Sequence, residues 1–250
     1  MDILSSFKQQ DTLNKEIWMN ANSPEKSKMN SKVRERLLEI AYEFQEFLDV
    51  DVVVDDVYMT GSLANFNWSD YSDIDLHLIV DFNQFSSDQL DLYRQLFTMK
   101  KTLFNLQHNI KIFGYDVELY VQDLHEEHAS GGVYSVLNDE WVIVPKKEKN
   151  EIDTKLLKQK VDSWMEKIDN AIDDSKEEPL EIATKKIKKL KEKIKEYRTS
   201  GLKKGGEYSY ENLVFKYLRR NGYIEKLFDY QIEKFDKELS LKEFKNYSKY

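Results

Sequence analysis

The stretch YMTGSLANFNWSDYSDIDLHLIVDF, residues 58–82, contains a Gly-Ser pair followed, after a spacer of ten residues, by an alternating segment that begins at Asp73. Successive residues of a strand point to opposite faces, so Asp73 and Asp75 share one face while the isoleucine and leucines between and after them form the other. Two carboxylates on one face repel each other unless a cation lies between them. The stretch therefore predicts a strand whose polar face holds a divalent metal ion.

The residue types indicate which ion and which ligand to expect. Oxygen ligands without His or Cys favour Mg²⁺ or Mn²⁺, and Mg²⁺ usually completes its shell with water and substrate phosphates. Gly61 has no Cβ, so the backbone there can approach a ligand closely, and Ser62 can offer an N–H and a hydroxyl to phosphate oxygens. A nucleoside triphosphate that brings its metal ion is therefore the expected ligand.

A third carboxylate is expected on a neighbouring strand. Residues 110–124, IKIFGYDVELYVQDL, have the pattern of a hairpin, and in its second arm Asp116 and Glu118 alternate with apolar residues. With a third carboxylate the site could hold two metal ions about 3.5–4 Å apart, as in enzymes that perform in-line displacement at phosphorus. We favour Glu118, because Asp116 lies nearer the turn, but strand alternation alone leaves Asp116 as the alternative.

These residues resemble a known signature. A Gly-Ser, a ten-residue spacer and a strand-borne Asp-x-Asp are similar to the DNA polymerase beta superfamily of nucleotidyltransferases. The segments GSLANFNWSDYSDIDLHLIVDF and SGGVYSVLNDEW look most like small predicted nucleotidyltransferases encoded by bacteriophages. The resemblance implies that Asp73, Asp75 and Glu118 are catalytic and bind metal, and that Gly61 and Ser62 hold the triphosphate. It also implies a short mixed sheet flanked by helices, followed by a helical domain.

Hydrophobic periodicity predicts the same organisation from the residues themselves. Helical spacing of apolar residues predicts helices over 33–48 and 87–107, with a strand over 54–60 between them and one or two more strands within 130–145. Beyond that point the pattern is helical, interrupted by glycines at 201, 205 and 206. We therefore predict an α+β protein with a catalytic domain, residues 1–147, and a helical domain, residues 148–250.

Composition separates the two parts further. The net charge is −8, but residues 1–150 hold 14 Lys and Arg against 26 Asp and Glu, whereas residues 151–250 hold 24 against 20. The chain has no cysteine, which excludes disulfides and thiolate chemistry. The sequence shows no apolar run of membrane-spanning length and no signal-peptide pattern, so we expect no membrane partner and a cytoplasmic location, that of the host cell if the chain is phage-encoded.

The basic part contains two candidate anion-binding features. Lys216 and Arg219, with Arg220, lie at helical spacing and form a cationic face, for which we predict a role as a triphosphate clamp. The lysine-rich run KKIKKLKEKIKEYR, residues 185–198, is compatible with RNA contact. The run lacks interleaved aromatic residues, and its apolar stripe favours an amphipathic helix with a solvated face.

The expected activity is transfer of a nucleoside monophosphate from an NTP to a hydroxyl, with pyrophosphate release. An RNA end, such as a tRNA 3′ hydroxyl, is the favoured acceptor; a small molecule, a protein or a second nucleotide, as in synthesis of a nucleotide messenger, are alternatives. The alternative from another class is a protein that binds or sequesters a nucleotide without turnover. The choice of base, the acceptor and the oligomeric state are left open by the sequence.

Overall fold

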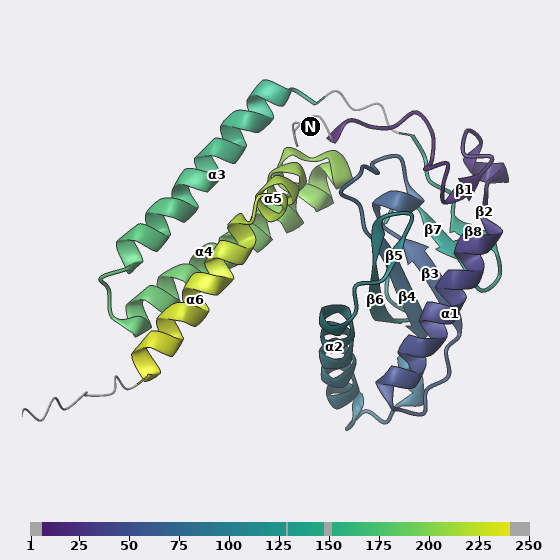
Figure 1. The fold of residues 1–250 in the computed structure, drawn as a ribbon, viewed down its shortest axis with the longest axis horizontal. Helices are drawn as coiled ribbons and strands as arrows, with labels where there is room; N and C mark the ends of the chain where they lie inside the picture. Colours follow the sequence, from purple (N-terminus) through teal and green to yellow (C-terminus); the bar gives the residue numbers. More distant parts are fainter. Residues whose placement is uncertain (1–6, 129, 148–151, 241–250) are drawn as a thin grey trace, which may run out of the picture. The chain divides into compact units, whose positions relative to one another are not determined.

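The protein is a mixed α+β chain, as predicted (Figure 1). The computed structural model describes residues 7–128, 130–147 and 152–240. Within these residues strands and helices alternate in the first part of the chain, and only helices follow in the second. The coarse order expected from hydrophobic periodicity is therefore confirmed.

The chain forms two compact units. Among the described residues, those from 7 to 147 belong to the sheet unit and those from 152 to 240 to the helical unit. The predicted boundary, between residues 147 and 148, adjoins the segment 148–151, which lies outside the described residues.

The sheet unit is built around a mixed six-stranded sheet with the strand order β5-β6-β4-β3-β7-β8. Its strands are β3 (Asp56–Thr60), β4 (Ile74–Val80), β5 (Lys111–Ile112), β6 (Tyr115–Asp123), β7 (Val133–Ser135) and β8 (Glu140–Ile143). β4 runs parallel to β6 and antiparallel to β3. The hairpin predicted over 110–124 is confirmed as β5 and β6, which pair antiparallel.

Two long helices pack with the apolar face of this sheet. They are α1 (Ser31–Leu48), which contacts β4, and α2 (Leu90–Gln107), which contacts β6 and α1. The apolar residues of β4, including Leu76 and Leu78, are fully buried in one core with Phe44 of α1 and Phe104 of α2. With this face buried, the opposite, polar face of β4 and β6 carries the predicted acidic residues.

The outer edge of β6 is held by a side chain. The Asn105 amide of α2 donates to the Leu119 carbonyl at 3.1 Å, and its carbonyl oxygen accepts from the Leu119 N–H at 3.0 Å. Such a two-point contact satisfies strand-edge groups that would otherwise need another strand or water. It also fixes the backbone of β6 next to Glu118.

The amino-terminal segment adds a small subdomain that the sequence did not predict. It contains a two-stranded sheet, β1 (Trp18–Met19) and β2 (Lys28–Met29), and a short 3₁₀ turn, η2 (Pro24–Lys26). The Trp18 ring stacks on Trp141 with ring centroids 4.5 Å apart, and its indole N–H donates to the Leu63 carbonyl at 2.7 Å. This bond anchors η3 (Ser62–Ala64), the turn that follows Gly61.

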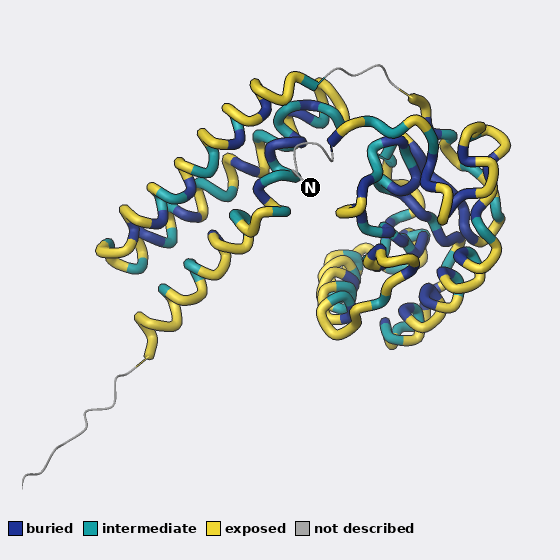
Figure 2. Tube along the Cα trace, turned by 45° about the horizontal axis from the view of Figure 1, so that its top comes forward, coloured by how far each residue is buried: buried dark blue, intermediate teal, exposed yellow. Residues whose placement is uncertain are grey.

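The helical unit consists of α3 (Thr154–Ser175), α4 (Leu180–Gly205), α5 (Tyr210–Arg220) and α6 (Tyr223–Leu239). A 3₁₀ turn, η5 (Gly206–Tyr208), links α4 to α5. A further 3₁₀ turn, η4 (Phe82–Gln84), follows β4 in the sheet unit. Leu227 is the one buried residue of α6, and most of this helix is exposed (Figure 2).

The expected break at Gly201 is wrong, because α4 continues through this residue to Gly205. Gly201 is buried, and a Cβ there would lie 2.4 Å from the Cβ of Glu211 and 2.8 Å from the Ser209 hydroxyl. The glycine is therefore explained by the close approach of α4 to the start of α5, not by a helix end.

Candidate functional site

Gly61 is the residue with the most constrained environment in the predicted site. It follows β3 with φ 77° and ψ −159°, a backbone region essentially restricted to glycine. A Cβ on Gly61 would lie 1.9 Å from Oδ2 of Asp75. The Gly61 N–H donates to the Ser130 hydroxyl at 3.3 Å. The Asp75 carboxylate thus lies directly against the backbone of the predicted triphosphate-binding residue.

The sheet register places Glu118 beside Asp75. Thr60 of β3 and Glu118 of β6 are the direct partners of Asp75 on its two sides. Residues paired across neighbouring strands share a face, so Thr60, Asp75 and Glu118 form one row across the sheet. Asp73 precedes β4 by one residue and, like Asp75 and Glu118, is neither buried nor fully exposed.

Glu118 and Asp116 differ in their neighbours. Asp116 is exposed, and its carboxylate is 2.5 Å from the Lys111 ammonium of β5. Glu118 lies in register with Asp75, and its Oε2 accepts a 2.5 Å hydrogen bond from the Tyr120 hydroxyl. The geometry favours Glu118 as the third carboxylate, since Asp116 already has a cationic partner at the sheet edge.

Tyr120 is a site residue that the sequence prediction missed. Its ring is stacked on the His77 imidazole, with centroids 4.7 Å apart and planes 19° from parallel, and the Lys101 ammonium lies 4.2 Å from the ring centroid. A ring held in this way has little freedom, so its hydroxyl presents a fixed donor to Glu118. Strand alternation could have identified Tyr120, which shares the polar face with Glu118.

His77, which lies beside Tyr120 on the same face of the sheet, is held neutral. Burial lowers the pKa of its imidazole to about 4, and its Nε2 lies 3.2 Å from the Thr60 hydroxyl. Burial disfavours the charged form, so the ring remains uncharged at neutral pH. His77 therefore adds no positive charge to the acidic face and acts there as a packing and hydrogen-bonding residue.

This low pKa predicts a stability that depends on pH. Between pH 6.5 and about 4 the unfolded chain binds a proton at His77 that the folded chain excludes, so the free energy of unfolding falls as pH falls. The loss should reach about 3 kcal/mol at pH 4. Urea titrations in the presence of a chelator should show this loss in the wild type relative to a His77→Gln variant. An equal pH dependence in both proteins would contradict the prediction.

Ser62 has a different hydrogen bond from the one expected. Its hydroxyl donates to the Ser72 hydroxyl oxygen at 2.7 Å, and this oxygen also accepts from the Ser69 N–H at 3.0 Å. These bonds tie the turn after β3 to the loop before β4. A phosphate could accept from the Ser62 hydroxyl only if it replaced Ser72 as the acceptor.

The predicted clamp residues Lys216 and Arg219 lie with Arg220 in the helical unit, on α5. The Lys216 ammonium is 2.8 Å from Oε2 of Glu207, and its side chain is 19% exposed. Burial opposes ionisation of Glu207, but Lys216, Arg198 and Asn212 together outweigh this effect and lower the carboxyl pKa. Lys216 thus has an internal partner. Arg219 lies in the last turn of α5 and is exposed.

The predicted metal ligands fit Mg²⁺ or Mn²⁺ in their chemistry. All are hard oxygen donors on one polar face, and the glycine beside Asp75 keeps side-chain bulk away from that carboxylate. In the part of the chain that the structure describes, no three His, Asp or Glu side chains converge closely enough to form a metal centre. Coordination of one metal ion by Asp73, Asp75 and Glu118 would require their carboxylates to move closer to one another.

Comparisons with known proteins add no family assignment. No protein-family model matches the sequence, and no curated protein or solved structure matches the chain significantly. Over the described ranges, no helix combines the length and apolar character needed to cross a bilayer. The fold and the acidic face define the class at a coarse level: an α+β protein with a mixed sheet whose polar face presents carboxylates beside a glycine with positive φ.

Proposed function

We propose that this protein is a metal-dependent nucleotidyltransferase that moves a nucleoside monophosphate from an NTP to an acceptor hydroxyl. The observation that carries the proposal is the contact between Gly61 and Asp75, in register with Glu118. A backbone that can approach a ligand, next to paired carboxylates, is suited to a triphosphate and its metal ion. The resemblance of residues 58–82 to DNA polymerase beta superfamily nucleotidyltransferases supports the same activity.

The reaction breaks one bond at phosphorus and forms another. The acceptor oxygen forms a bond to the α-phosphorus, the bond from that phosphorus to the bridging oxygen breaks, and pyrophosphate leaves with the bonding electrons. The acceptor's proton passes to Glu118 or to water. Tyr120 orients Glu118 for this role through the bond to Oε2. Mg²⁺ or Mn²⁺, when held by Asp73, Asp75 and Glu118, would supply positive charge that stabilises the transition state.

The acceptor is proposed to be an RNA end, such as a tRNA 3′ hydroxyl. The support is the positive balance of residues 151–250, which favours a polyanion. A small molecule, a protein hydroxyl or a second nucleotide would use the same chemistry. The proposed place of action is the cytoplasm, that of a host cell if the chain is encoded by a bacteriophage.

The deciding experiment follows the label from the triphosphate. Purified protein is incubated with each α-³²P-labelled NTP, Mg²⁺ or Mn²⁺ and total cellular RNA, and RNA, protein and small molecules are then separated. We expect label on one fraction and none with the Asp73→Ala/Asp75→Ala variant, which removes two metal ligands. A variant that transfers label as fast as the wild type would refute the proposal. NTP binding without transfer to any fraction would favour the nucleotide-sequestering alternative.

A further inference from the structure

The helical unit contains a groove that the proposed transfer site does not use. A cavity of about 600 Å³ is lined by residues of α4, α5 and α6. Its apolar lining includes Ile194, which is buried, and Leu227, the buried residue of α6. An apolar cavity of this size is in the range of small-molecule and nucleotide sites.

One wall of the groove is cationic. Lys191, Lys195 and Arg198 line it from α4, and their spacing of four and three residues places them in one row along the helix. From the helical rise, Lys191 and Lys195 are about 6 Å apart along the axis, and Arg198 lies about 4–5 Å further on. The groove therefore presents a line of three positive charges, beside which Glu192 of α4 contributes one carboxylate.

The facing helices supply aromatic rings. Phe215 of α5 lies with its ring centroid 4.4 Å from the Arg198 guanidinium, and the Phe228 ring of α6 lies 3.5 Å from the Lys191 ammonium. Phe228 is 52% exposed. The lysine-rich run of α4 has a single aromatic residue, Tyr197 near its end, but the fold places rings from two other helices beside its cations.

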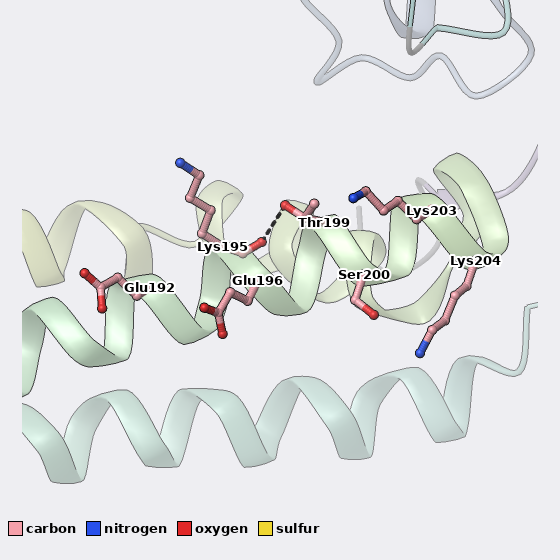
Figure 3. Close-up of a pocket in the computed structure, with 7 residues that line it drawn as sticks. All are labelled: Glu192, Lys195, Glu196, Thr199, Ser200, Lys203 and Lys204. Carbon is pink, nitrogen blue, oxygen red and sulfur yellow. Dashed lines mark hydrogen bonds between the residues drawn. The ribbon is translucent and has the colours of Figure 1, made fainter.

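Two of these cations have no acidic partner among the described residues. The Lys191 ammonium donates to the Gln231 carbonyl oxygen at 2.7 Å and lies over Phe228, and burial lowers its pKa. Lys195 is exposed and projects from α4 on the side opposite Glu196 (Figure 3). Of the two, only Lys191 is partly buried, and a partly buried ammonium without a carboxylate is costly unless an anion compensates it.

We propose that this groove between α4, α5 and α6 binds a single-stranded polynucleotide. A row of cations follows a phosphate backbone, and aromatic rings stack bases without sequence preference. The groove combines both along one direction, as a repeating ligand with alternating phosphates and bases requires. A ligand with one acidic head group would use one of the cations and leave Lys191 or Lys195 uncompensated.

The binding assay is separate from catalysis, so it can succeed or fail independently of the proposed transferase activity. The full chain carrying Asp73→Ala/Asp75→Ala is titrated, without NTP or metal, into a fluorescein-labelled single-stranded RNA of about twelve nucleotides, and anisotropy is followed. A DNA strand of the same sequence forms a second arm, which tests whether the 2′-hydroxyl contributes. We expect both strands to bind and duplex RNA to bind more weakly.

Two double lysine-to-alanine variants test the cationic wall of the groove. Lys191→Ala/Lys195→Ala should weaken binding on the order of tenfold or more and reduce the slope of log affinity against log salt by about 1.4, or about 0.7 for each lost phosphate contact. Lys189→Ala/Lys193→Ala is the matched control, because both lysines are exposed on the opposite side of α4 and do not line this groove. Equal losses in the two pairs would overturn the proposal, since general charge attraction would then suffice.

Two variants that each replace one aromatic residue by leucine test base stacking. Phe228→Leu keeps the apolar surface and removes the ring, and should weaken RNA binding on the order of tenfold. Tyr42→Leu, a similar change at an exposed residue of the sheet unit, should leave affinity unchanged. Unchanged binding by Phe228→Leu, or competition by inorganic polyphosphate as strong as that by RNA, would overturn the proposal. So would a full chain that binds no single strand at all.

Discussion

The Glu118→Gln variant should lose nucleotide transfer by roughly a thousandfold while it remains folded. Gln keeps the shape of Glu118 and its hydrogen bond from Tyr120, but it removes the negative charge that would hold the metal ion and accept the acceptor's proton. Loss of a metal ligand removes several kcal/mol of transition-state stabilisation, and a thousandfold change in rate corresponds to about 4 kcal/mol. The measurement is kcat/KM for pyrophosphate release, with thermal unfolding as the check on folding.

Asp116→Asn is the matched control for this prediction. It also neutralises one carboxylate on the polar face of β6, two residues away, but that carboxylate is exposed and bound to Lys111. We expect its rate to stay within about threefold of the wild type, because an exposed ion pair contributes little. If Asp116→Asn lost as much activity as Glu118→Gln, the third carboxylate would have been assigned to the wrong residue.

The parts of the fold that follow from local periodicity could be predicted from sequence. The period-two pattern placed Asp73, Asp75 and Glu118 on polar strand faces, and helical spacing located α1 and α2 to within a few residues. These patterns record which side of an element is buried, and burial of apolar surface dominates folding. The placement of Asp75 and Glu118 on one strand face was therefore predictable, whereas Asp73 lies one residue before β4 begins.

Contacts between elements could not be read in this way. The register that sets Asp75 beside Glu118, the bond from Ser62 to Ser72 and the pairing of Lys216 with Glu207 all depend on how segments meet in space. Helical spacing made Lys216 a plausible surface cation, but it contained no information on a carboxylate from the preceding turn. The helix end expected at Gly201 was wrong for the same reason, because this glycine is explained by the close approach of a neighbouring helix.

The Gly61→Ala variant should be both destabilised and strongly impaired in transfer. Alanine at φ 77° and ψ −159° carries a backbone cost of about 1–3 kcal/mol. Its methyl group would also meet Oδ2 of Asp75 at 1.9 Å, so that carboxylate must move from its place beside Glu118. A displacement of about 1 Å in a catalytic group can cost about a hundredfold in rate. Urea denaturation and initial transfer rates measure the two effects.

Gly206→Ala separates the collision from the backbone strain. Gly206 has nearly the same backbone angles, φ 62° and ψ −154°, but a Cβ there has no atom within 4 Å. Gly206→Ala should therefore pay the conformational cost alone and keep full activity, whereas Gly61→Ala should lose more stability and most of its transfer rate. Equal losses of stability with transfer intact in both variants would mean that the Asp75 carboxylate can leave Gly61 without consequence. The close contact would then have no bearing on how the acidic face works, and the main structural support for the proposed activity would be gone.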